Sequence, residues 1–237
     1  MDYVDRYRNG EHVEVWDELQ ALGPAVRGEA HFSQAQQVAA ETMRRVKRNC
    51  ESLASRLRAM GYDFGKYPDG SRRTYNPPPI TPPSKAIRSD CSELETQAGP
   101  LPISLVAFWQ EVGAVDLVGM HRGWPSGLDP LVVDPPEGAL SFLFDLEGGE
   151  ADPDGATFFA GLAPDDLHKD NVSGGDPYGV NLPNPSADFK FQNERHGLLF
   201  VPYLRLAILR WGGFPGLDGE AVPFEPLRGL VDGLEPF

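Results

Sequence analysis

The densest group of side chains that could do chemistry is the run Asp-Asp-Leu-His-Lys-Asp at residues 165–170, followed by Asp176. Three carboxylates and an imidazole within six residues could bind a hard cation or transfer protons. The run lacks the ligand spacing of a calcium loop, so a solvated acidic loop is the favoured interpretation. If the run is functional, it forms either the site of a hydrolase or a surface for a basic partner.

The sequence lacks the other motifs of common catalytic sites. None of the five histidines belongs to a His-Glu-x-x-His motif or to a Cys/His cluster, and there is no Gly-x-Ser-x-Gly motif, P-loop or Gly-x-Gly-x-x-Gly motif. His121 with Asp129, near Trp124, could frame a site at the end of a sheet, although a turn with Trp124 in the core is favoured. We therefore expect no catalytic residues, metal or cofactor, and a binding protein more than an enzyme.

The charge of the chain is concentrated in its second half. The net charge is −14, and residues 131–237 hold 6 basic against 18 acidic side chains, compared with 15 against 17 before them. Such an acidic half argues against nucleic-acid binding, and it fits either solubility or a basic protein partner. The sequence shows no signal peptide and no apolar run long enough to span a membrane, so we expect a cytoplasmic protein without a membrane partner.

A long amphipathic helix is predicted at residues 33–60. Its apolar positions recur at steps of three and four and form one seam: Ala39, Met43, Val46, Cys50, Leu53, Leu57 and Met60. Its other side is a basic face: Arg44, Arg45, Lys47, Arg48, Arg56 and Arg58. We expect the seam to dock on the core and the basic face to lie near the acidic half or in water. An exposed seam at 39–60 would instead indicate a structural subunit that oligomerises through it.

The chain divides into an N-terminal segment (1–65), a proline-rich connector (66–90) and a domain (91–237) that packs with the long helix as one unit. The clearest element of the domain is a helix at 101–113, where Pro102 suits the first turn and Gly113 ends the helix. Further elements are predicted as strands at 115–119, 131–133, 141–146, 157–162, 178–182 and 188–192, with helices at 92–98 and 200–211. The predicted fold is α+β, with a mixed, largely antiparallel sheet and flanking helices.

Residues 91–216 resemble the SUKH superfamily, of the Smi/Knr type. The resemblance lies in the Leu-Pro entry to the 101–113 helix, the polar segments 163–167 and 174–182, and the closing helix that starts at Phe200. It implies a protein-binding module and, in bacterial members, an immunity protein that neutralises a toxin, commonly a nuclease. An acidic inhibitor would complement a basic nuclease surface. The residues expected to bind the partner are four carboxylates and one aromatic anchor: Asp165, Asp166, Asp170, Asp176 and Tyr178.

Overall fold

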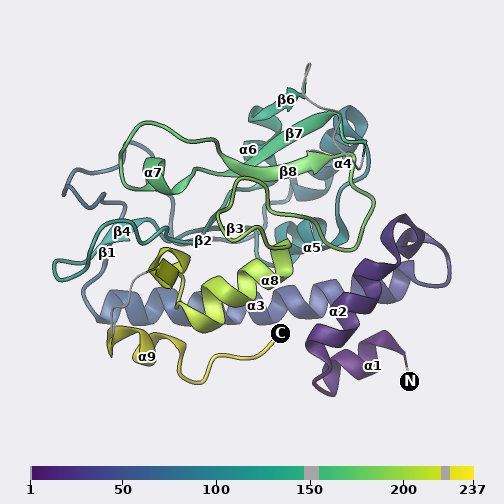
Figure 1. Ribbon diagram of the computed structural model, residues 1–237, viewed down its shortest axis with the longest axis horizontal. Helices are drawn as coiled ribbons and strands as arrows, with labels where there is room; N and C mark the ends of the chain where they lie inside the picture. The colour runs from purple at the N-terminus through teal and green to yellow at the C-terminus, as the bar shows by residue number, and fades with distance from the viewer. Residues whose placement is uncertain (1, 147–154, 220–224) are drawn as a thin grey trace.

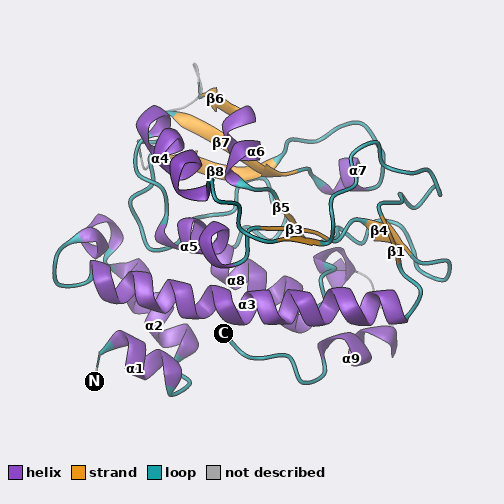
Figure 2. Ribbon diagram, turned by 180° about the vertical axis from the view of Figure 1, so that it is seen from behind, coloured by secondary structure: helices purple, strands orange, loops and turns teal. Residues whose placement is uncertain are grey.

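The computed structural model describes residues 2–146, 155–219 and 225–237, and one long helix, α3 (Phe32–Ala59), runs along the molecule (Figure 1). Helices α1 (Tyr3–Arg8) and α9 (Glu225–Val231) lie on one side of α3, and the strands lie on the other (Figures 1 and 2). The prediction of a long helix preceding an α+β domain is confirmed.

The apolar seam of α3 is covered by the rest of the chain. Its members from Ala39 to Leu57 are fully buried, and they share one continuous apolar core with the domain that follows. Helix α2 (His12–Ala21) also packs here, where Trp16 Nε1 donates to Thr42 Oγ1 at 3.0 Å. Since the seam is buried within the chain, it offers no exposed surface for oligomerisation.

The 101–113 prediction corresponds to α5 (Ile103–Glu111), which packs directly on α3. Its apolar face is buried because Leu105, Phe108 and Trp109 all point into the core. Gly113 ends the helix with φ 93°, and a Cβ at this position would lie 2.1 Å from the Thr81 carbonyl oxygen. Both the backbone conformation and the close approach therefore require glycine.

The strands of the described residues form three small antiparallel sheets. The first pairs β1 (Asp63–Phe64) with β4 (Gly119–Met120). The other two contain the remaining strands: β2 (Ile80–Thr81), β3 (Ala114–Asp116) and β5 (Val132–Val133), then β6 (Leu143–Asp145), β7 (Phe158–Ala163) and β8 (Tyr178–Leu182). Strand β2 comes from the proline-rich run, so this segment is part of a sheet as well as a connection.

The structure differs from the prediction before β6 and at residues 188–192, whereas the predicted strand at 141–146 corresponds to β6. Residues 136–141 form helix α6 (Pro136–Ser141) before β6, because Pro136 suits the first turn of a helix. Residues 188–192 make only isolated bridges, although the alternation that suggested a strand is real, with Phe189 and Phe191 buried. The remaining helices are α4 (Ile87–Ala98), α7 (Asp166–Lys169) and α8 (Phe200–Arg205), with single turns at Gly23–Arg27, Leu206–Arg210 and Pro215–Gly219.

None of the helices within the described ranges has both the length and the apolar character needed to cross a membrane.

Candidate functional site

The acidic segment, defined as residues 165–176, begins with a short helix that its own first residue caps. Asp165 Oδ1 accepts hydrogen bonds from the backbone N–H groups of Leu167 at 2.8 Å and His168 at 3.1 Å. Its Oδ2 contacts His168 Nδ1. The Asp165 side chain is buried, and Gly175 closes over it, since a Cβ there would lie 2.6 Å from Asp165 Cγ. Asp165 therefore holds α7 in place from the inside.

Lys169, the lysine of the acidic segment, points into the core. Its side chain is fully buried, and Nζ lies 2.5 Å from Oδ1 of the equally buried Asp129. The hydroxyl of Tyr178 donates to Asp129 Oδ2 at 3.3 Å, and Lys169 Nζ lies 4.5 Å from the centre of the Tyr178 ring. Burial and the nearby Asp129 raise the pKa of Tyr178, so its hydroxyl stays protonated and can donate. This cluster ties α7 to β8 and to the loop before β5.

The other carboxylates of the acidic segment lie at the surface. Asp176 is exposed and Asp166 is partly exposed, while Asp170 is half-buried and accepts a hydrogen bond from the Gly127 N–H at 2.6 Å. The five predicted partner-binding residues are thus divided by the fold. Asp166, Asp170 and Asp176 face outward, whereas Asp165 and Tyr178 lie inside, where Tyr178 would have to leave the core to anchor a partner.

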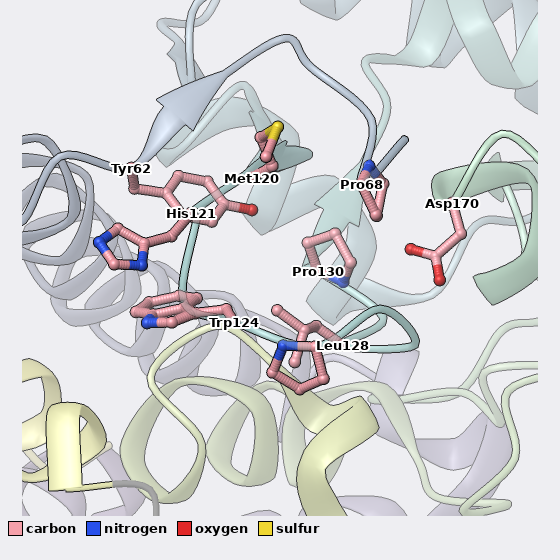
Figure 3. Close-up of a pocket in the computed structure, with 10 residues that line it drawn as sticks. Tyr62, Pro68, Met120, His121, Trp124, Leu128, Pro130 and Asp170 are labelled. Atoms are coloured by element: carbon pink, nitrogen blue, oxygen red, sulfur yellow. The ribbon is translucent and has the colours of Figure 1, made fainter. Parts of the chain in front are cut away.

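An aromatic pocket adjoins the acidic segment at Asp170 (Figure 3). On one side the rings of Tyr62 and His121 each lie close to that of Trp124, with centres 5.4 and 5.2 Å from it. On the opposite side Figure 3 shows the carboxylate of Asp170. The enclosed volume is about 30 Å³. Ten residues line the pocket: Tyr62, Pro68, Gly119, Met120, His121, Trp124, Pro125, Leu128, Pro130 and Asp170.

Local structure fixes the walls of this pocket. Tyr62 donates its hydroxyl to the Leu117 carbonyl oxygen at 3.0 Å, and Gly119 allows the ring to pack closely, because a Cβ there would lie 2.4 Å from Tyr62 Cε1. His121 and Trp124 form the predicted turn, in which the Trp124 N–H donates to the His121 carbonyl oxygen. The Nδ1 of His121 accepts from the Gly123 N–H at 3.2 Å, so the neutral ring carries its proton on Nε2.

This arrangement gives little support to a hydrolase. His168 contacts Asp165, but its side chain is 50% exposed and lies outside the pocket. Asp129, which was expected beside His121, binds Lys169 instead. Within the ranges that the structure describes, no group of three or more His, Cys, Asp or Glu side chains could hold a metal ion.

Two features of this region were not predicted from the sequence: the burial of Lys169 and the aromatic pocket. Lys169 was taken as one charge in a solvated loop, and no local signal marks it as buried, because its partner Asp129 lies forty residues away. The pocket had a weak signal, since residues 119–130 combine glycines and prolines with His121 and Trp124. Its remaining walls, Tyr62 and Asp170, come from distant parts of the chain.

Comparisons of this chain with models of protein families, with curated proteins and with solved structures gave no match.

Proposed function

We propose that this protein is a non-catalytic protein-binding module that presents the acidic segment to a basic protein partner. One observation carries the proposal. The lysine of the segment is buried against Asp129, while Asp166, Asp170 and Asp176 face outward from the same short stretch of chain. The positive charge that could have neutralised these carboxylates locally is therefore used inside the protein. The carboxylates that remain at the surface attract cations.

The anchoring of the segment supports a binding role as well. Asp165 caps α7, and Lys169 and Asp170 tie it to Asp129 and to Gly127. A surface that is already ordered loses less conformational entropy when a partner binds. Opposite charges on the two proteins would also accelerate their encounter.

In its specific form, the proposal is that of a cytoplasmic immunity protein that neutralises a basic toxin such as a nuclease. Its support is the resemblance of residues 91–216 to the SUKH superfamily, which lies in a helix entered by Leu101-Pro102, strands after it and a closing helix. The excess of acidic residues in 131–237 also matches the basic surfaces of nucleases.

Co-expression with the products of the neighbouring genes tests the proposal. We expect one of these products to be a basic toxin, to co-purify with this chain and to lose its activity in the complex. The double variant Asp166→Asn/Asp176→Asn should weaken the complex by about tenfold or more, with a smaller difference at high salt.

The matched control is Asp17→Asn/Glu93→Gln, which removes two exposed carboxylates from α2 and α4. If this control weakens the complex equally, net charge alone is responsible and the acidic segment is not the binding surface. If none of the neighbouring products binds the purified protein, the immunity role is wrong.

A further inference from the structure

We propose that the aromatic pocket receives a primary ammonium group, the end of one lysine side chain of the partner. The lysine as a source rests on the proposed function, whereas the preference for a primary ammonium follows from the pocket alone. Three properties of the pocket lead to this ligand: its size, its charge and its walls.

Size limits the occupant to a small group. An enclosed volume of about 30 Å³ has space for one or two water molecules. An ammonium group is close to water in size, so it fits where a ring or a sugar does not. Pro68 and Pro125 also line the hollow, and their apolar surfaces can cover the methylene stem of a lysine.

The charge of the lining favours a cation. Asp170 is the only carboxylate among the ten described lining residues, which include no Lys or Arg. Lys169 directly precedes Asp170 in the sequence, but it points to Asp129. Burial, with Asp166 and Asp129 nearby, raises the pKa of Asp170, and a bound cation would offset this effect.

The walls can stabilise the same charge. Trp124 and Tyr62 present aromatic rings, and a cation over such a ring is attracted to its negative face by about 0.5–2 kcal/mol. Trp124 also packs edge-on against Phe214, with ring centres 5.3 Å apart, which fixes its orientation. Figure 3 shows the rings and the Asp170 carboxylate on opposite sides of the pocket, so a cation that enters the pocket lies between them.

The carboxylate geometry favours lysine over arginine. Asp170 Oδ2 already accepts a hydrogen bond from Gly127 N–H, which leaves Oδ1 as the oxygen open to a ligand. A guanidinium group binds best to two carboxylate oxygens in one plane, whereas an ammonium group needs only one. The planar guanidinium is also too large for the enclosed volume.

The test uses the full chain and a small probe, N-acetyl-lysine methylamide. We expect millimolar binding, detected by NMR as a shift of the Trp124 indole signal, which a Trp124→Phe variant assigns. The probe acetylated on its side-chain nitrogen keeps the shape and loses the charge, so it should bind at least tenfold more weakly, as should the arginine counterpart. Equal binding of the acetylated probe would overturn the proposal.

Two variants locate the site. Asp170→Asn keeps an oxygen for Gly127 N–H, so the fold should persist, as its unfolding curve would confirm. It should weaken binding of the lysine probe at least tenfold, while Asp17→Asn, on α2 and outside the pocket, should leave it unchanged. Undiminished binding by a folded Asp170→Asn variant would show that the pocket is not the site.

The outcomes separate this proposal from the proposed function. If the lysine probe binds through Asp170 but no neighbouring gene product binds, the pocket is right and the immunity role is wrong. If a basic partner binds and Asp170→Asn leaves its affinity unchanged, the protein is a binding module that does not use this pocket.

Discussion

The charged side chains of the basic face of α3 and of the acidic segment differ in their partners. Arg48 forms a two-point ion pair with Glu235, and Arg56 donates to the backbone carbonyl oxygens of Leu230 and Asp232. The basic face therefore binds the chain's own C-terminal segment, residues 228–237, on the side of α3 away from the acidic segment (Figure 1). In the acidic segment Lys169 and Asp165 are buried, while Asp166, Asp170 and Asp176 face outward.

This difference shows that a run of like charges in a sequence does not by itself mark a binding surface. The basic helix face has the composition of a nucleic-acid site, yet much of it serves internal contacts. Asn49 strengthens the same contact by exchanging two hydrogen bonds with the Glu235 backbone, at 2.8 and 2.9 Å. In the acidic segment the internal contacts involve Asp165, Lys169 and Asp170, while Asp166 and Asp176 remain at the surface.

The largest expected effect comes from Lys169→Met. This change removes the partner of Asp129 and leaves a carboxylate uncompensated in the core. We expect a loss of about 3–5 kcal/mol in the free energy of unfolding, measured by chemical denaturation.

The double variant Lys169→Met/Asp129→Asn is the matched control. Asparagine tolerates the positive φ of Asp129, 47°, and can still accept from Tyr178. The double variant should recover most of the stability that Lys169→Met loses. If Lys169→Met alone costs less than about 1 kcal/mol, the buried pair does not anchor the acidic segment.

Particular residues show how far the sequence could predict this structure. The seam of α3 and the face of α5 were predictable because regular spacing is a local property. Which residues of the acidic segment are buried was not predictable. Lys169 and Asp170 bind Asp129 and Gly127, which only tertiary folding brings close to them. Helix α6 was missed because Pro136 signals both a turn and a helix start.

The next effect concerns the basic face. Arg56→Ala removes the hydrogen bonds to the carbonyl oxygens of Leu230 and Asp232, each 2.7 Å long. We expect a loss of about 1–2 kcal/mol and faster hydrogen exchange in residues 228–237. Lys47→Ala, which replaces another basic residue of α3, should change stability by less than about 0.5 kcal/mol. Equal effects of the two changes would mean that the C-terminal segment does not depend on Arg56.

The contributions of the two regions to the free energy of unfolding should change with pH in opposite directions. The hydrogen bond from Arg48 lowers the pKa of Glu235 below its usual 4.5, so this pair stabilises the fold above pH 4.5 and is lost as the pH falls through the lowered value. Burial raises the pKa of Asp170 above its usual 3.8, so its contribution is largest below pH 3.8 and is lost as the pH rises through the raised value.

Measuring the free energy of unfolding from pH 3 to 7 would check the direction of both pH dependences. Glu235→Gln should remove the first dependence, by up to about 1 kcal/mol because the pair is exposed, and Asp170→Asn should remove the second. Identical pH curves for the wild type and both variants would show that neither carboxyl group is coupled to folding.

The smallest effect on stability is expected at Asp176, which is proposed to bind the partner. Asp176 is exposed, so Asp176→Asn should change the unfolding free energy by less than about 0.5 kcal/mol. Asp165→Asn should cost about 1 kcal/mol, because it keeps the oxygen that caps α7 but removes the negative charge at the start of the helix and beside His168. Measured together by thermal unfolding, the pair tests whether the fold separates the structural carboxylates from the binding ones. A loss for Asp176→Asn as large as that for Asp165→Asn would remove this distinction, and with it the reason for placing the partner at the outward carboxylates.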